Sequence, residues 1–182
     1  MILASNHLSF IDSIIIPLVV PRHVTFLAKA EYWTARGVKG RVYRWFFTTM
    51  GNIPVDRDDP RAGQRSLDDA LAVLQRGGAF GIYPEGTRSR DGKLHPGHTG
   101  VAWLALAGSA PVVPVAVRGT DKVQPVGRRL PRPVRGVQVH FGAPIDPSRQ
   151  LTTGARPAQV RRELTDHVMD SIHKMSGQEL AA

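Results

Sequence analysis

A histidine and an aspartate near the start of the chain, His7 and Asp12, have the residue types that acid–base catalysis uses. They follow the apolar run at residues 1–4, which is typical of a buried strand, so His7 falls on the loop that leaves this strand. In open α/β sheets, sites form just past the strand ends. A histidine there can take a proton from a hydroxyl, and a nearby carboxylate can fix its tautomer and stabilise the imidazolium.

The separation of His7 and Asp12 sets a condition on the local structure. The two side chains can meet only if a turn follows His7 and Asp12 opens a helix, which Pro17 would keep short or kinked. Taken alone the pair is weak support for a site, because a surface histidine beside a helix-capping aspartate is a common arrangement. Other segments of the chain must decide between the two interpretations.

Two of these segments place an arginine just past a short strand. Arg57 ends the segment at 51–57, and Arg88 lies in the segment at 83–90, which follows a strand at 79–82. The carboxyl ends of parallel strands share one edge of a sheet, so we expect a base and two arginines to converge there. Arginine binds phosphate through two parallel hydrogen bonds and keeps its charge, which favours an anionic substrate.

The neighbours of Arg88 add polar groups to this edge. Gly86 lets the backbone approach a ligand closely, and Thr87 offers a hydroxyl and a backbone N–H. Glu85 would repel a phosphate if it stood alone, so we expect it to orient Arg88 or to accept a hydrogen bond from a substrate hydroxyl. A surface salt bridge is the commoner outcome for any single arginine, so the prediction depends on the segments acting together.

The elements that must position these residues alternate between strands and helices. This alternation predicts an α/β fold, a single domain with a largely parallel central sheet flanked by helices. The Asp59-Pro60 pair is typical of a helix start, and Gly77-Gly78 of a helix end. The expected strands are 1–4, 23–28, 53–55, 79–83, 112–117 and 137–141, and the expected helices are 59–76, 100–107, about 157–176 and a mostly helical stretch at 29–50 that breaks near Gly37 and Gly40.

Composition and charge limit the classes of function. A chain of 182 residues suits one domain. It has no cysteine, which excludes disulfides, thiolate metal sites and a thiol nucleophile. No apolar run approaches the roughly 20 residues that span a bilayer, and no signal peptide is evident. The net charge of +9 favours anionic partners, namely phosphorylated substrates, nucleic acid or an anionic membrane surface.

Two basic stretches bear on the choice of partner. The bases at 118–135 have no aromatic residues among them, which argues against a platform for single-stranded nucleic acid. Residues 41–47 mix arginines with large aromatics on a predicted helix. Such a helix can lie in a membrane interface, or its aromatics can pack inward while its arginines face water, and the sequence leaves both interpretations open.

Taken together, these segments resemble the blocks of the glycerolipid acyltransferase family, the PlsC-like lysophosphatidate acyltransferases. His7 and Asp12 match the H-x-x-x-x-D block, and residues 51–57 match the second block. Residues 85–88, Glu-Gly-Thr-Arg, match the third block, and Pro114 matches the fourth. Any one block is weak, but four blocks in the family's order at these spacings are a specific signal.

The resemblance has consequences for the organisation of the chain. It implies one acyltransferase domain over residues 1–182, with the blocks in a core at 1–145 and a C-terminal helix at about 157–176. Members of the family usually carry a segment before the first block, whereas this chain starts almost at that block. An internal start and a minimal version of the enzyme are the two interpretations. The resemblance also implies peripheral attachment to the cytoplasmic face of the cell membrane, with no transmembrane helix in this chain.

The activity that the resemblance implies is transfer of a fatty acyl group from acyl-CoA or acyl carrier protein to 1-acylglycerol-3-phosphate, giving phosphatidic acid. His7 would take the proton of the free hydroxyl, and Asp12 would orient His7. Arg57 and Arg88 would hold the phosphate. The thioester is a co-substrate, and neither a bound cofactor nor a metal is expected. The remaining site residues that the resemblance implies are Glu85, Gly86 and Thr87 for substrate binding and Pro114 for the acyl pocket.

Other classes of function stay open at this point. The acceptor could be another lysophospholipid or glycerol-3-phosphate, or the chain could be a catalytically silent module of the same fold that binds lipid or membrane. A metal hydrolase would have to use His7, Asp12, His95 and His98, which lack a compact ligand spacing. A nucleic-acid binder, suggested by charge alone, lacks a recognition motif, so no nucleic-acid partner is expected.

Overall fold

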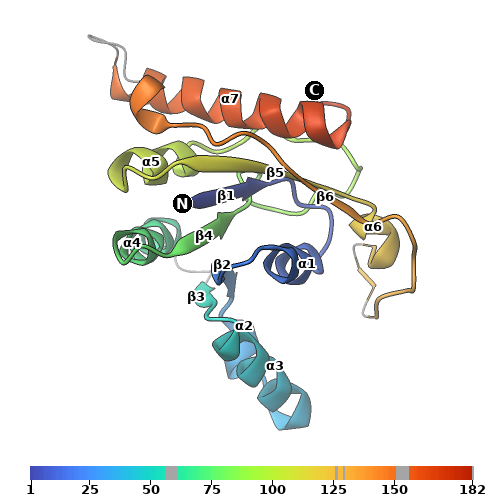
Figure 1. Cartoon of the computed structure of the whole chain (residues 1–182). Coiled ribbons are helices and arrows are strands. Elements are labelled where there is room, and N and C mark those ends of the chain that lie inside the picture. The colour runs from blue at the N-terminus through green and yellow to red at the C-terminus, as the bar shows by residue number, and fades with distance from the viewer. Residues whose placement is uncertain (56–60, 126, 129, 151–155, 182) are drawn as a thin grey trace.

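The computed structural model describes residues 1–55, 61–125, 127–128, 130–150 and 156–181. It is a six-stranded, mostly parallel sheet with helices packed against it (Figure 1). The strands are β1 (Ile2–Ser5), β2 (Val24–Lys29), β3 (Ile53–Val55), β4 (Ala79–Ile82), β5 (Val112–Arg118) and β6 (Gln138–Phe141). The helices are α1 (Asp12–Val19), α2 (Glu31–Thr34), α3 (Gly37–Thr49), α4 (Ala62–Gln75), α5 (Gly100–Ala107), α6 (Thr120–Val123) and α7 (Pro157–Ser176), with a 3-10 turn η1 (Pro147–Gln150).

The order of the strands brings the candidate residues to one edge of the sheet. The order is β3-β2-β4-β1-β5-β6, and every pairing is parallel except that of β5 with β6. Within it, Ile2 of β1 lies between Phe80 of β4 and Val112 of β5. The carboxyl ends of β1, β3 and β4 therefore share one edge, as expected for parallel strands. The predicted α/β fold is confirmed, and the strands match their expected bounds to within one residue at each end.

Both faces of the sheet are buried, because successive side chains of a strand point to opposite faces. On one face, Ile2, Phe80 and Val112 belong to the larger core cluster, which includes residues of α4, α5 and α7. On the other face, Leu3 of β1 packs with Ile16 of α1. The strands therefore read as near-continuous apolar runs, which is typical of parallel sheets covered on both sides.

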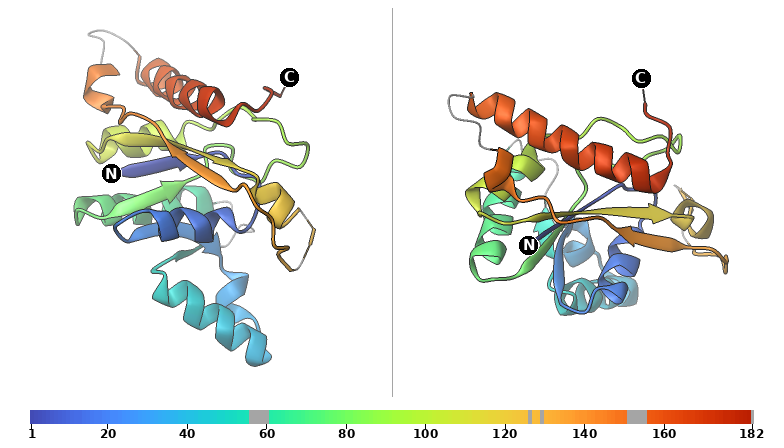
Figure 2. Two further views of the ribbon diagram at one scale, coloured as in Figure 1. Left: turned by 45° about the vertical axis from the view of Figure 1, so that its right-hand side comes forward. Right: turned by 45° about the horizontal axis from the view of Figure 1, so that its top comes forward.

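The stretch at 29–50 is helical in two pieces, and the break lies between α2 and α3. Gly37 begins α3 with a φ of +77°, which suits glycine at a helix boundary. Gly40 does not break the helix. A Cβ at Gly40 would lie 1.9 Å from the carbonyl oxygen of Ala35, so this glycine permits the close approach of the turn between the two helices. Figure 2 shows the pair standing clear of the rest of the molecule.

The ends of the longer helices agree with the sequence signals in most respects. Helix α4 begins at Ala62 with Arg61 as its N-cap, whereas the predicted start at Asp59-Pro60 lies outside the described residues. It ends before Gly77, which has a φ of +76°. Helix α7 starts at Pro157 and buries the apolar residues predicted for its inner face, Val160, Leu164, Val168 and Ile172. Within the described ranges, no helix combines the length and apolar character needed to cross a bilayer.

Candidate active site

The loop after β1 and the first residue of α1 bring His7 and Asp12 together. Nδ1 of His7 lies 2.9 Å from Oδ2 of Asp12. The Asp12 N–H closes a turn onto the Ser9 carbonyl, and Asp12 then begins α1, so the condition set by the sequence is met. Because Nδ1 of the ring faces the carboxylate and donates to it, Nε2 is the nitrogen that can accept a proton.

Asp12 is fully buried, and one of its oxygens accepts three hydrogen bonds. Besides the His7 ring, Oδ2 accepts the backbone N–H groups of Leu8 and Ser9, both at 2.8 Å. These donors offset the cost of burying a negative charge and fix the shape of the turn. The other oxygen, Oδ1, is buried without a hydrogen-bond partner in the described part of the chain. Oδ2 of Asp12 therefore both orients the His7 ring and holds the backbone of the loop that carries it.

The loop after β4 holds the other side of His7. Tyr83 stacks on the imidazole with ring centroids 3.8 Å apart and planes 9° apart. The hydroxyl of Tyr83 lies 2.8 Å from that of Ser13, and burial raises the pKa of Tyr83 well above its usual value, so the phenol stays neutral. The Ser89 N–H donates to the His7 carbonyl at 2.7 Å. The ring is thus positioned by two separate loops, as a preorganised base requires.

Glu85 connects two loops of the site, and its predicted hydrogen bond from a substrate hydroxyl stays a prediction. Its Oε1 accepts the backbone N–H of His7 and its Oε2 accepts that of His95, both at 3.0 Å. The side chain is buried, and burial raises the pKa of this carboxyl, while the two backbone donors act in the opposite direction. Instead of orienting Arg88, the carboxylate joins the His7 loop to the loop at 94–98.

A cleft of about 290 Å³ opens beside His7 and has two kinds of lining. One kind is basic and polar and includes Arg88, Arg90 and Thr87. Within the described ranges, neither arginine forms an ion pair with a carboxylate. The other kind is aromatic and apolar, and it comes from Phe10, Leu27, Tyr32 and Phe47. A cleft with both kinds suits a ligand that has an anionic part and an apolar part.

The acyltransferase family model matches residues 1–118, which run from β1 to the end of β5. This span contains both His7 and Asp12, together with the whole of the segment at 83–90. The chain belongs to the acyltransferase family. The resemblance stated from the sequence blocks is therefore confirmed.

Several curated relatives of this chain are named 1-acyl-sn-glycerol-3-phosphate acyltransferases. The chloroplastic BAT2 protein of Brassica napus is 34% identical over 123 residues, which make up 68% of this chain and 34% of that protein. The protein of Limnanthes douglasii is 34% identical over 144 residues, which make up 78% of this chain and 49% of that protein. The acyltransferase chain thus spans about a third to a half of the length of these relatives.

A solved structure agrees with the family assignment. The crystal structure of the 1-acyl-sn-glycerophosphate acyltransferase PlsC from Thermotoga maritima matches this acyltransferase with a TM-score of 0.71 at 27% sequence identity. The match covers 96% of this chain and 66% of that chain. The α/β fold inferred from the strand–helix alternation is therefore that of a known acyltransferase.

The other predicted site residues fall in three kinds of place in the acyltransferase. Gly86, Thr87 and Arg88 line the cleft together with His7, as expected. Arg57 lies outside the described residues. Pro114 is buried within β5 and is not among the residues that line the cleft, so the predicted acyl pocket finds no counterpart in that lining.

The fit of Pro114 inside the sheet has a simple explanation. Its carbonyl accepts the Gly142 N–H at 2.8 Å, just past the end of β6. In a strand, the N–H and C=O of one residue point to the same side, so the missing N–H of Pro114 removes one hydrogen bond on the side of Gly142 and none on the side of β1. The pairing resumes beyond the proline, where Val112 and Ile145 exchange both of their backbone hydrogen bonds.

The sequence did not predict the contacts that connect the site to the rest of the chain. The side chain of Asn6 bonds both the N–H and the C=O of Val117, at 2.7 and 3.0 Å, and fixes the end of β1 against β5. Tyr32 and Phe47 stack with centroids 4.6 Å apart and line the cleft. The only sequence signal for this aromatic wall is the density of aromatic residues around the predicted helix at 41–47.

The two histidines that a metal hydrolase would need besides His7, namely His95 and His98, form other contacts. Nε2 of His95 lies 3.0 Å from Oδ1 of Asp91, which helps to lower the pKa of Asp91 to about 2. His98 is exposed, and its backbone N–H donates to the Pro84 carbonyl. Across the described residues, no three side chains of His, Asp or Glu are placed to hold a metal ion.

We expect the Glu85→Ala variant to lose stability as well as any acyl-transfer activity. The substitution removes the acceptor of two backbone N–H groups, which costs about 2–4 kcal/mol of unfolding free energy and frees the His7 loop. Urea unfolding and acyl-transfer rates measure the two effects. An exposed carboxylate, Glu163, supplies the matched control Glu163→Ala, for which both quantities should stay near wild type. A fully stable but inactive Glu85→Ala protein would instead favour the predicted contact with substrate.

Proposed function

We propose that the chain catalyses transfer of a fatty acyl group to the free hydroxyl of 1-acylglycerol-3-phosphate, giving phosphatidic acid. The observation that carries this proposal is the His7–Asp12 pair, which borders a cleft with both basic and aromatic lining. The names of the curated relatives, 1-acyl-sn-glycerol-3-phosphate acyltransferases, support the same reaction. The acceptor has a phosphate for the basic lining and an acyl chain for the apolar lining.

In the proposed mechanism, Nε2 of His7 takes the proton of the acceptor hydroxyl as its oxygen attacks the thioester carbonyl carbon. The tetrahedral intermediate collapses when the carbon–sulfur bond breaks. The imidazolium then returns the proton to the departing thiolate, so His7 ends the cycle neutral. Asp12 stabilises the imidazolium while it exists and keeps the proton on Nδ1 between turnovers. Attack is direct in this proposal, because the chain has no cysteine and the hydroxyl of Ser9, the serine of this loop, donates to the Gln124 carbonyl at 2.7 Å.

The acyl donor in this proposal is a thioester, either acyl-CoA or acyl carrier protein, which binds as a co-substrate. The reaction needs no bound cofactor and no metal, because general-base catalysis contributes about 10²–10⁴ in rate and positioning of the two substrates supplies much of the rest. No nucleic-acid partner is part of the proposal.

The same proposal places the chain at the cytoplasmic face of the cell membrane as a peripheral protein. The acceptor is a lipid and resides in the bilayer, so the cleft must meet a membrane surface. The net charge of +9 suits a surface that carries anionic lipids.

A labelled long-chain acyl-CoA, offered to the chain with 1-acylglycerol-3-phosphate, tests the proposal directly. Formation of labelled phosphatidic acid is the expected result. Transfer only to another lysophospholipid or to glycerol-3-phosphate would show that the acceptor is a different one, and the proposed mechanism would still hold. A folded chain that binds lipid without any transfer, from either type of donor, would be a catalytically silent module.

We expect Arg88→Ala to weaken binding of the acceptor more than it slows the chemical step. Arg88 lines the cleft beside His7 and is assigned to the phosphate of the acceptor. Loss of a charge-assisted hydrogen bond of this kind costs about 1.5–3 kcal/mol, which corresponds to a KM for the acceptor about 10–150-fold higher. Initial rates at varied acceptor concentration measure the change. Arg156→Ala, at an exposed arginine before α7, is the control. An unchanged acceptor KM in Arg88→Ala would remove the phosphate assignment.

A further inference from the structure

Helix α3 presents apolar side chains on two opposite faces. Phe47 is buried, stacks with Tyr32 and lines the cleft. Val38, Val42 and Trp45 recur at the i, i+4 and i+7 spacing of one helix face, and their side chains are 67%, 55% and 69% exposed. Trp45 and Phe47 are two residues apart, which is about 200° around a helix, so the exposed face points away from the cleft.

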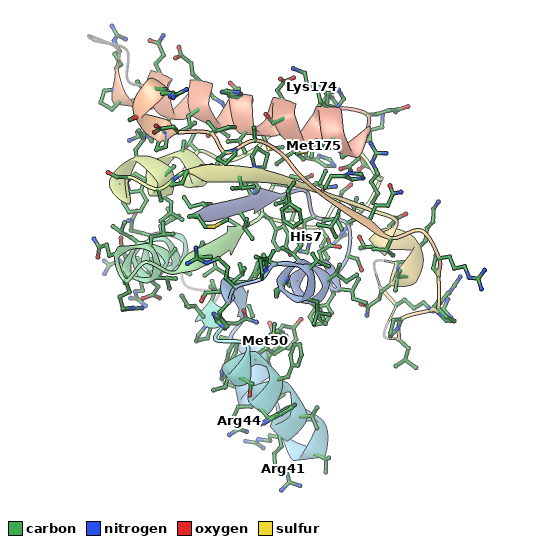
Figure 3. The ribbon with its side chains drawn as sticks, in the orientation of Figure 1. His7, Arg41, Arg44, Met50, Lys174 and Met175 are labelled. Atoms are coloured by element: carbon green, nitrogen blue, oxygen red, sulfur yellow. The ribbon has the colours of Figure 1, made fainter. Side chains whose placement is uncertain are left out.

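The charged residues of α3 itself are all basic. Residues 32–55 contain four basic residues and no acidic residue. Two of the bases, Arg41 and Arg44, are exposed on α3 beside the apolar stripe. Figure 3 shows Arg41 toward the outer end of the helix and Arg44 between Arg41 and Met50, both on the part of the molecule that lies away from His7. An apolar stripe with basic residues of the same helix beside it is complementary to a bilayer that carries anionic head groups.

The position of α3 connects this face to the catalytic cleft. Helices α2 and α3 project from the sheet beside β2 and β3, and Met50 marks the place where α3 rejoins the body (Figure 3). Tyr32 of α2 and Phe47 of α3 form part of the cleft wall. One short helical pair therefore borders the cleft on one side and exposes an apolar, basic face on the other.

We propose that the α3 face, defined as Val38, Arg41, Val42, Arg44 and Trp45, docks onto an anionic lipid surface and presents the cleft to the lipid that enters it. The valines and Trp45 enter the interface between head groups and acyl chains, and the arginines contact the lipid phosphates. The proposal rests on the proposed function only in that the acceptor comes from the bilayer. A second copy of the chain is a poorer occupant, because it would bring Arg41 and Arg44 against another basic surface.

Vesicle co-sedimentation tests this docking surface without requiring turnover. The full chain is mixed with phosphatidylcholine vesicles that contain an anionic fraction of phosphatidylglycerol, and with pure phosphatidylcholine vesicles. We expect wild type to bind the anionic vesicles preferentially. The Val38→Ser/Val42→Ser/Trp45→Ser variant should partition about 100-fold more weakly, since three apolar side chains no longer enter the interface. The Arg41→Gln/Arg44→Gln variant should lose about 10–30-fold, and only on anionic vesicles.

Matched controls remove similar groups from other parts of the surface. Leu18→Ser/Val19→Ser changes two exposed apolar residues at the far end of α1, and Arg128→Gln/Arg135→Gln removes two exposed bases from the stretch at 118–135. Both control variants should bind vesicles like wild type. The α3 variants should retain wild-type kcat on a short-chain, water-dispersed acceptor, because their altered side chains do not line the cleft.

The outcomes separate this proposal from the proposed function. Weak vesicle binding in the α3 variants alone supports the docking surface, whether or not the chain transfers an acyl group. Equal binding of the α3 variants and wild type would overturn it, as would absence of wild-type binding or an equal loss in the controls. Circular dichroism checks the fold, and if the apolar variant is misfolded the charge variant decides the question alone. Active protein that binds vesicles through another surface would refute the docking face and keep the reaction.

Discussion

Acyl transfer by the His7→Ala variant is expected to fall by about 10²–10⁴-fold relative to wild type, because the acceptor hydroxyl loses its general base. The loss should appear in kcat, since the groups assigned to acceptor binding, among them Arg88, are unchanged. Initial rates with labelled acyl-CoA and saturating acceptor measure it. The variant also loses the ring that stacks on Tyr83 at 3.8 Å, so a modest loss of unfolding free energy, about 1 kcal/mol, is expected.

The control for this prediction is another histidine of the same chain. His140 is exposed on β6 and lies outside the cleft, so His140→Ala should keep near wild-type rates. Circular dichroism and urea unfolding show whether His7→Ala is folded. A folded His7→Ala protein with wild-type turnover would contradict the proposed mechanism, and the family membership of the chain would be unaffected.

The second large effect is expected for Asp12→Asn, which preserves shape and removes charge. The asparagine carbonyl can take the place of Oδ2. It can accept the ring N–H of His7 and the backbone N–H groups of Leu8 and Ser9. Its NH₂ group then occupies the place of Oδ1, which is buried without a partner among the described residues. We expect the turn to survive but kcat to fall at least about 100-fold, because the buried charge that stabilises the imidazolium is gone.

Comparison with Asp12→Ala separates the electrostatic role of Asp12 from its structural role. Alanine removes the acceptor of three hydrogen bonds at a fully buried position, so the unfolding free energy should drop by about 3–5 kcal/mol. Asp12→Asn should stay closer to wild-type stability in the same urea titration. Equal kcat for Asp12→Asn and wild type would show that catalysis does not need the negative charge.

The fold was largely predictable because its signals are local. Buried strands of a parallel sheet are short apolar runs. β5 (Val112–Arg118) can be predicted from such a run without knowing which strands lie beside it in the sheet. The last helix was equally clear, from a proline at its start and apolar residues at four-residue spacing. The predicted break near Gly40 is wrong. A glycine is needed there because the Ala35 carbonyl lies close by, and this contact cannot be predicted from the order of residues alone.

The sequence predicts which residues belong to the candidate site, but it does not predict the contacts that several of them form. The His7–Asp12 contact follows from one turn, so the spacing sufficed for it. The role of Glu85 could not be predicted, since its partner His7 lies 78 residues away in sequence. Nor could sequence place the stack of Tyr83 on His7, which depends on β1 and β4 being neighbours in the sheet. Contacts between strand ends require the strand order, and the alternation of elements does not specify it.

The central position of β1 has a consequence for synthesis of the chain on the ribosome. Ile2–Ser5 find their strand partners in β4 and β5, which are made later and end at Ile82 and Arg118. Contacts of such long sequence separation form slowly. Until they form, the unpaired apolar strand can aggregate or bind chaperones. The nascent chain should therefore stay sensitive to protease until β5 has left the ribosomal tunnel. Assembly of the His7 loop therefore follows the synthesis of β5, although the loop comes well before β5 in the sequence.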